Sequence, residues 1–149
     1  MNSVADYISD IVEPTIQEYL DEVLDRRRCF LACLAAYHVI DRIAEAKLWD
    51  CKSAAQAALA LKKKCPAFGI VEDVALALKH TKAGGSDRVR LRESDVTERP
   101  PGNWDVAVWD VSRWDDPTGG HEARRSSGSD DVTAAIQDVL RFLVQNFGR

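Results

Sequence analysis

The sequence predicts a mainly α-helical protein of the α+β class. We expect a bundle of three to four main helices with a small antiparallel β-meander inserted before the C-terminal helix. Apolar residues recur at helical spacing up to about residue 85 and again after residue 129. Between these two parts, apolar and polar residues alternate with the period of two that is typical of strands. Seven of the eight glycines lie at Gly84 or later, so the character of the chain changes there.

Length and composition favour one globular domain with a real core. The chain has 149 residues, of which 46% are hydrophobic and 30% charged. We expect a helical part at 1–85, the meander at 86–128 and a C-terminal helix at 129–149 that packs back on the bundle. The formal charge is −4 and the only concentrations of basic residues are short, so charge does not support a nucleic-acid partner. No apolar stretch is long enough to span a membrane, and the first residues do not resemble a secretory signal, so we expect a cytoplasmic protein without a membrane partner.

The first helical part begins with Ser3 as a predicted N-cap, and Pro14 fits the first turn of a second helix. From Thr15 to about Leu48 nothing in the sequence breaks the helix, which predicts a rod of roughly 50 Å at 1.5 Å per residue. One arc of this rod carries an apolar stripe. The stripe consists of Ile16, Leu20, Val23, Leu24, Phe30, Leu31 and Leu34.

Two further helices follow. Ser53 and Gln56 form a capping-box pair ahead of a short helix that ends in three lysines. The next helix is predicted from about Pro66 to Lys82. Cations suit its last turn, and Gly84 is placed to end it in the left-handed conformation.

The meander is predicted from three segments. Arg88 to Arg92 and Trp104 to Val111 alternate with period two, and a third, weaker strand is expected near His121 to Ser126. The last helix is predicted to start with Ser129 or Asp130 as its N-cap.

Projection of the apolar stripe places His38 and Asp41 on the same arc, where apolar residues are expected. We therefore expect both side chains to be buried and hydrogen-bonded. A carboxylate three residues from an imidazole can orient it and raise its pKa, as a general base requires, and Arg42 adds positive charge beside it. Asp73 and His80 share a face of the later helix, from which each is predicted to meet a partner on the first helix.

The candidate site contains catalytic and ligand-binding residues. The catalytic candidates are His38, Asp41 and His80, and the ligand-binding candidates are Arg42, Asp73 and Lys79. The alternative is a polar network that fixes the register of the helices without a chemical role.

The four cysteines lack the spacing of a zinc ribbon, and we predict buried thiols. We predict no cofactor and no metal; a metal held by the two histidines, Asp41 and Asp73 is the weaker alternative because the Glu-x-x-His pairs of di-iron bundles are absent.

Two motifs carry a resemblance to a known superfamily. "AAYHVIDRI" (Ala35 to Ile43) in the first helix and "DVALALKHTK" (Asp73 to Lys82) at the end of a later one resemble uncharacterised bacterial and phage-encoded helical proteins, which in turn are similar to the HEPN superfamily. The resemblance covers about two thirds of the chain and implies a helical bundle. HEPN ribonucleases carry an arginine a few residues before a histidine, on a helix that faces its copy across a dimer. This sequence departs from that pattern, because Arg28 lies too far before His38 and no arginine precedes His80 on its helix.

Two functions follow as hypotheses. The first is an interaction or dimerisation module of bacterial or phage origin, whose partner is another protein or a second copy. It is favoured because the sequence has no phosphate-binding loop, nucleophile elbow or zinc signature. The alternative is a HEPN-like ribonuclease or other hydrolase that uses the His/Asp cluster. An exposed tryptophan among Trp104, Trp109 and Trp114 would indicate a partner surface.

Overall fold

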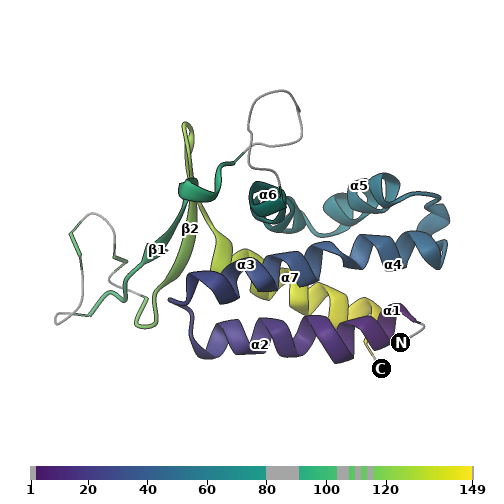
Figure 1. Ribbon diagram of the computed structural model, residues 1–149, viewed down its shortest axis with the longest axis horizontal. Helices are drawn as coiled ribbons and strands as arrows, with labels where there is room; N and C mark the ends of the chain where they lie inside the picture. The colour runs from purple at the N-terminus through teal and green to yellow at the C-terminus, as the bar shows by residue number, and fades with distance from the viewer. Residues whose placement is uncertain (1–2, 80–90, 104–107, 110–111, 114–115, 149) are drawn as a thin grey trace.

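A computed structural model of the chain describes residues 3–79, 91–103, 108–109, 112–113 and 116–148. It is mostly helical, and a three-stranded antiparallel sheet precedes the C-terminal helix. The predicted fold class is therefore confirmed (Figure 1). Among the described residues, no helix combines the length and the apolar character needed to cross a membrane.

The chain begins with a short helix, α1 (Val4–Tyr7), capped by the Ser3 side chain as predicted. A π-helical segment, Ile8–Val12, leads directly into α2 (Glu13–Asp21), with proline in its first turn. One face of this continuous stretch is buried. The buried side chains are Val4, Ile8, Val12, Ile16 and Tyr19.

The predicted rod from Thr15 to Leu48 is wrong. α2 ends at Asp21, the chain turns through residues 22–25, and α3 (Arg26–Tyr37) packs beside α2 as a helical hairpin (Figure 1). The carboxylate of Asp25 accepts a hydrogen bond from the backbone N–H of Arg28 at 3.0 Å and so begins a new helix. This N-cap, and not the apolar spacing, decides the local structure. α4 (Val39–Glu45) then continues beyond His38 in roughly the direction of α3.

The next two helices largely follow the prediction. The Ser53 side chain caps α5 (Ala54–Lys64) by accepting from the Gln56 N–H at 3.3 Å, and the Gln56 side chain accepts from the Lys52 N–H at 2.8 Å. α6 spans Phe68–Lys79 in the described part of the chain. The predicted end of this helix, with His80 and Gly84, lies outside the described residues.

The sheet contains β1 (Val96–Arg99), β2 (Gly120–Arg125) and β3 (Gly128–Asp131) in the order β1-β2-β3. Val96 pairs with Ala123, and Glu122 pairs with Asp131. β2 agrees with the third predicted strand. The first strand lies later than the predicted Arg88 to Arg92, where Leu91 and Arg92 are outside any strand, although Arg88 and Arg90 are not described.

The middle predicted strand, Trp104 to Val111, falls mostly on residues that are not described. Val108 and Trp109 belong to the loop between β1 and β2 and not to a strand.

The last helix, α7 (Val132–Phe147), begins at Asp131, whose side chain accepts from the Ala134 N–H at 3.0 Å. The predicted N-cap at Ser129 or Asp130 is therefore one or two residues too early. α3 is the central helix and packs against α2, α6 and α7, so the core lies around it.

Candidate functional site

The predicted dyad forms, but on the surface. Nδ1 of His38 lies 2.9 Å from Oδ2 of Asp41, so the predicted hydrogen bond is confirmed. The two side chains are 46% and 58% exposed, so the predicted burial is wrong. The turn at residues 22–25 resets the helical phase on which the projection depended. Val39, Ile40 and Ile43 occupy the buried positions instead.

The other predicted site residues do not converge on this dyad. Arg42 forms an ion pair with Glu45 at 3.2 Å, and its guanidinium lies 5.5 Å from the centre of the Tyr7 ring. Asp73 is buried and accepts a hydrogen bond from Arg125 of β2 at 2.8 Å. Asp73 therefore ties α6 to the sheet and does not face an exposed histidine.

Lys79 is exposed at the end of α6, and the neighbouring His80 lies outside the described residues. In the part of the chain that the structure describes, no three His, Cys, Asp or Glu side chains are placed to hold a metal ion.

A second polar cluster, not predicted from the sequence, lies where the sheet meets the helices. The Tyr19 hydroxyl of α2 is 2.9 Å from Nδ1 of His121 on β2 and 2.7 Å from the Thr133 hydroxyl on α7. The backbone N–H of His121 donates to the Thr133 oxygen at 2.8 Å. Tyr19 and His121 are 0% exposed and Thr133 is 7% exposed. We call these three residues the buried cluster.

A glycine pair lets the strand come this close to α7. A Cβ atom on Gly120 would collide with the Thr133 side chain, and one on Gly119 would collide with the backbone carbonyl of Arg99. Gly119 also has a φ of +71°, a conformation that glycine adopts readily. The close approach of β2 to the first turn of α7 is what allows the hydroxyl of Thr133 to reach both His121 and Tyr19.

Two thiols of α3 adjoin the buried cluster. Cys29 and Cys33 are both 0% exposed and lie one helical turn apart. Hydrogen bonding by Cys33 lowers the pKa of Cys29 to about 6 against the effect of burial, and His121 and Tyr19 add to the lowering. Burial raises the pKa of Cys33 and that of Tyr19 well above their ordinary values. α3 thus holds one acidic thiol beside one that keeps its proton.

A buried cation lies next to this cluster. Arg99 of β1 is 3% exposed and contacts Asp116 at 2.6 Å and Asp131 at 3.2 Å. Burial alone would lower the pKa of Arg99, but its hydrogen bonds and charge interactions with both carboxylates outweigh that effect and raise it. Asp131 is also the N-cap of α7, so Arg99 fixes the start of that helix against the sheet.

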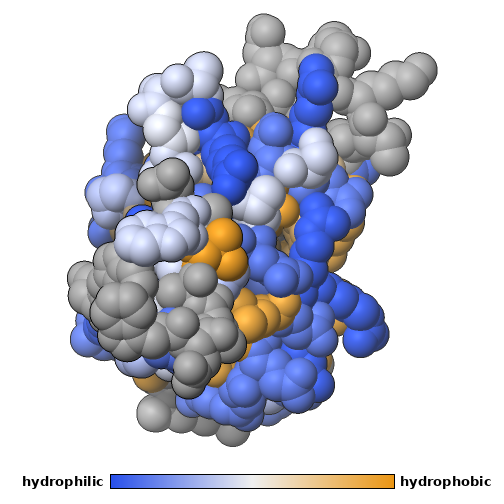
Figure 2. All heavy atoms as spheres, turned by 90° about the vertical axis from the view of Figure 1, so that its left-hand side faces the viewer, coloured by the Kyte–Doolittle hydropathy of each residue, from blue (hydrophilic) through white to orange (hydrophobic). Residues whose placement is uncertain are grey.

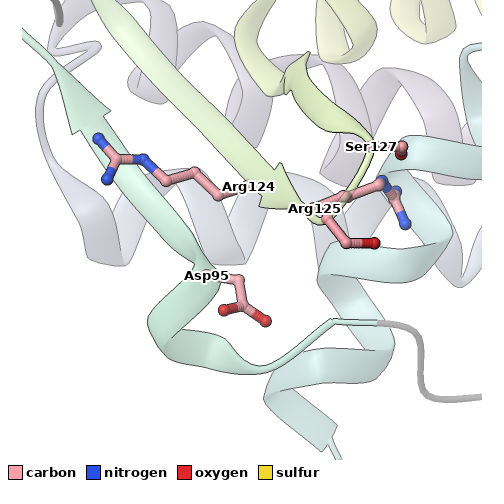
Figure 3. A pocket seen from close by; sticks show the side chains of 5 residues that line it. Asp95, Arg124, Arg125 and Ser127 are labelled. Carbon is pink, nitrogen blue, oxygen red and sulfur yellow. The ribbon is translucent and has the colours of Figure 1, made fainter.

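A shallow pocket of about 490 Å³ opens beside the turn between β2 and β3. Asp95, Arg124, Arg125, Ser126 and Ser127 line it. Figure 3 shows the side chains of Arg124 and Arg125 pointing to opposite sides. Arg125 is already held by Asp130 and Asp73. The two cations therefore do not converge on a common anion, and the pocket is not a phosphate site.

Exposed apolar side chains are scattered over the surface. Trp109 is 78% exposed and Val108 is 48% exposed in the loop between β1 and β2. Figure 2 views the end of the molecule that carries the sheet, and its hydrophobic atoms form small patches separated by hydrophilic ones. On the helical hairpin, Leu24 and Leu31 are 38% and 39% exposed, although the predicted stripe places both in the core.

Sequence reasoning missed the buried cluster because Tyr19 lies 102 and 114 residues away from its two partners in the chain. One local signal was present: the Gly119-Gly120 doublet directly before His121 indicates a close backbone approach. No protein-family model, curated protein or solved structure matches this chain. The resemblance to the HEPN superfamily therefore stays a prediction.

Proposed function

We propose that this protein is an interaction module of bacterial or phage origin that pairs with a second copy of itself. The contact surface is the outer face of the hairpin, which we define as Leu24, Arg27, Leu31, His38 and Asp41. The observation that carries the proposal is the pattern of exposure and charge along this face. Leu31 lies in its middle, Leu24 and the cation Arg27 lie toward one end, and the carboxylate of Asp41 lies at the other.

Helical geometry aligns this face. Residues spaced by three, four or seven positions share one side of an α-helix, which places Arg27, Leu31 and His38 in one row. α3 buries its opposite side, including Cys29, Cys33 and Ala36, against the other helices. Asp41, which is hydrogen-bonded to His38, extends the same row into the first turn of α4.

The charges on this face complement those of a second copy turned by a two-fold rotation. Arg27 and Asp41 are fourteen positions apart, which is roughly 21 Å along a helix. An antiparallel pairing centred near Leu34 brings Arg27 of each copy opposite Asp41 of the other. The same rotation brings the two copies of Leu31 to either side of the axis. A two-fold contact of this kind uses one patch twice, as most homodimers do.

The test is the mass in solution by sedimentation equilibrium over a range of concentrations. We expect a reversible dimer that Leu31→Glu converts to a monomer, because two carboxylates would then enter an apolar contact. Leu59→Glu is the matched control, since Leu59 is 59% exposed on α5, which carries no residue of the outer face. A chain that is monomeric at every concentration, or a dimer that Leu59→Glu breaks as readily, contradicts the proposal.

A charge exchange tests the orientation. Arg27→Glu alone and Asp41→Lys alone should each weaken the dimer, because each places like charges opposite one another. The double variant should restore it, because the new pair is again opposite in sign. Failure of the double variant to recover would exclude the antiparallel arrangement.

A hydrolase is the second candidate function, and the geometry of the dyad favours it. The Asp41 carboxylate fixes the His38 ring through Nδ1, and the ring is half-exposed, as an accessible general base requires. Its test is hydrolysis of single-stranded RNA and of simple esters by the wild-type chain and by His38→Ala. Turnover that His38→Ala does not reduce would exclude His38 as the base.

We also assign the protein to the cytoplasm within this proposal. All four cysteines are free thiols in the structure, which fits a reducing compartment.

A further inference from the structure

The turn that joins β2 to β3 presents two hydroxyl groups to solvent. Ser126 and Ser127 form the tip of this hairpin, between the paired residues Arg125 and Gly128, and both serines are exposed. Neither hydroxyl is hydrogen-bonded to another residue that the structure describes. A Cβ atom on Gly128 would meet no atom within 4 Å, so the space beside the turn is open. An enzyme can therefore reach both hydroxyls.

Two arginines precede the turn and make its serines unequal. Protein kinases that select substrates by charge bind cations near the acceptor hydroxyl. Ser127 has arginines two and three positions before it, and the intervening Ser126 lets the acceptor enter an active site while the cations reach acidic groups outside. Ser126 has an arginine directly beside it. The side chain of Arg124 is 54% exposed, so it is accessible to such an enzyme.

We propose that Ser127 is a phosphorylation site for an arginine-directed serine kinase, which uses ATP and selects serines that follow arginine. The bond between the γ-phosphorus and its bridging oxygen breaks, and a P–O bond forms to Oγ of Ser127. The hydroxyl proton passes to the carboxylate base of the kinase, and ADP leaves. This site is independent of self-association, because the hairpin contains no residue of the outer face.

The shallow pocket beside the turn accommodates the product. Its volume is about 490 Å³, and Ser127 and Arg125 both line it. A free anion would meet one cation at a time there, because Arg124 and Arg125 point to opposite sides (Figure 3). A phosphate on Ser127 does not need both cations, because its covalent bond already holds it in the pocket. It carries a charge of about −1.5 to −2 and three strong acceptor oxygens.

The phosphate competes with Asp73 for Arg125. Arg125 contacts Asp130 at 2.5 Å and Asp73 at 2.8 Å. Asp130 belongs to the same hairpin and moves with the turn, whereas Asp73 belongs to α6. When Arg125 turns toward the phosphate, the buried carboxylate of Asp73 loses its cation. Phosphorylation therefore loosens the connection between α6 and the sheet.

The first experiment treats the folded protein with magnesium, ATP and a purified arginine-directed serine kinase, followed by peptide mass analysis. A peptide of residues 120–131 is the positive control, because it offers the same charges without the fold. We expect one phosphate at Ser127 in the full chain and none in Ser127→Ala. Ser126→Ala is the matched control and should be phosphorylated like the wild-type chain.

Two results would overturn the proposal. One is the absence of phosphate from the folded chain, whether or not the peptide accepts it. The other is phosphate on Ser126 or Ser129 in place of Ser127.

Arg124→Gln tests whether charge selects the site. The rate at Ser127 should fall at least about tenfold, because the kinase loses one cation. The fold should be unaffected, since the only ion pair of Arg124 within the described residues is an exposed one with Glu122 at 3.6 Å. Arg141→Gln is the control, because Arg141 is 65% exposed on α7. Equal rates in the two variants would exclude an arginine-directed kinase.

Hydrogen exchange measures the structural consequence. In the phosphorylated chain, the backbone amides of α6 around Asp73 should exchange at least about fivefold faster, whereas those of α2 should not change. Arg125→Gln removes the same connection without phosphate and should reproduce the increase. An increase in Arg125→Gln alone would show that Arg125 stays on Asp73 after phosphorylation. No increase in either chain would show that the Asp73–Arg125 pair does not hold α6, and both results contradict the proposed loosening.

Discussion

The outer face and the buried cluster each contain a histidine with a hydrogen bond of the same length. His38 is 2.9 Å from Asp41, and His121 is 2.9 Å from Tyr19. The first bond joins residues three apart on a half-exposed surface, whereas the second joins residues 102 apart inside the protein. Water can replace the partner of His38, but no solvent reaches His121. The two bonds have the same length but should contribute unequally to stability because their burial differs, and the predictions below test how burial changes the contribution of a polar group.

The largest effect is expected from the buried cation beside the cluster. Arg99→Met should lower the free energy of unfolding by about 3 kcal/mol, because Asp116 and Asp131 lose the charge that neutralises them. Urea denaturation measures this loss. Arg113→Met is the matched control: Arg113 also contacts Asp131, at 3.2 Å, but is 49% exposed. Its loss should be less than about 1 kcal/mol. Equal losses in the two variants would show that burial does not decide the contribution.

Removal of the central hydroxyl should have the next largest effect. Tyr19→Phe leaves Nδ1 of His121 and the Thr133 hydroxyl without their shared partner, at a cost of about 1–3 kcal/mol. Tyr7→Phe removes one hydrogen bond, from the Tyr7 hydroxyl to the Ala35 carbonyl at 2.9 Å, at a partly buried position. It should cost about 1 kcal/mol. A smaller loss for Tyr19→Phe than for Tyr7→Phe would contradict the expectation that the buried cluster contributes more to the free energy of unfolding than the Tyr7 hydrogen bond does.

The buried cluster and the adjoining thiol of Cys33 should also make the protein sensitive to alkali. The pKa values of Cys33 and Tyr19 are raised by burial, so the folded state holds protons that the unfolded state releases. Their stabilising contribution is complete below the ordinary pKa values, about 8.5 for Cys and 10 for Tyr, and is lost progressively as the pH rises above them. Each group lowers the free energy of unfolding by about 1.4 kcal/mol per pH unit in that range.

Urea titrations at pH 8 to 11 test this slope. In Tyr19→Phe the tyrosine contribution is absent, so the decline above pH 10 should be shallower than in the wild-type chain. Identical slopes would mean that Tyr19 ionises as readily in the folded protein as in the unfolded chain.

Local signals in the sequence predicted the elements that local interactions determine. Ser3 and Ser53 cap their helices as expected, and β2 lies close to the third predicted strand. The long rod was predicted wrongly because apolar spacing alone cannot show a turn. The apolar pattern takes no account of Asp25, whose side chain caps α3 and so ends the continuity. That one turn changes the phase of every later residue in the projection and moves His38 from the core to the surface.

The buried cluster depends on tertiary structure, and so pattern reasoning had no access to it. Tyr19, His121 and Thr133 come from two helices and a strand, and only the packing of β2 on α7 brings them together. The Gly119-Gly120 doublet indicated a close approach but not its partner. Helix periodicity reports which side of an element is buried. It does not report which buried side chains meet.

The smallest effect is expected at His38. Its side chain and that of Asp41 are about half exposed, so His38→Ala should lower the free energy of unfolding of the isolated chain by roughly 0.5 kcal/mol or less. Dilute samples in urea measure this contribution without self-association. In the proposed dimer the outer face of one copy meets that of another, so in concentrated samples the same substitution should weaken the dimer measurably in sedimentation equilibrium. Asp138→Ala provides the control, because Asp138 forms a similar exposed pair with Arg141 on α7 at 2.9 Å. If His38→Ala and Asp138→Ala behave alike at both concentrations, the His38–Asp41 pair is an ordinary surface pair and does not contribute to the proposed dimer contact.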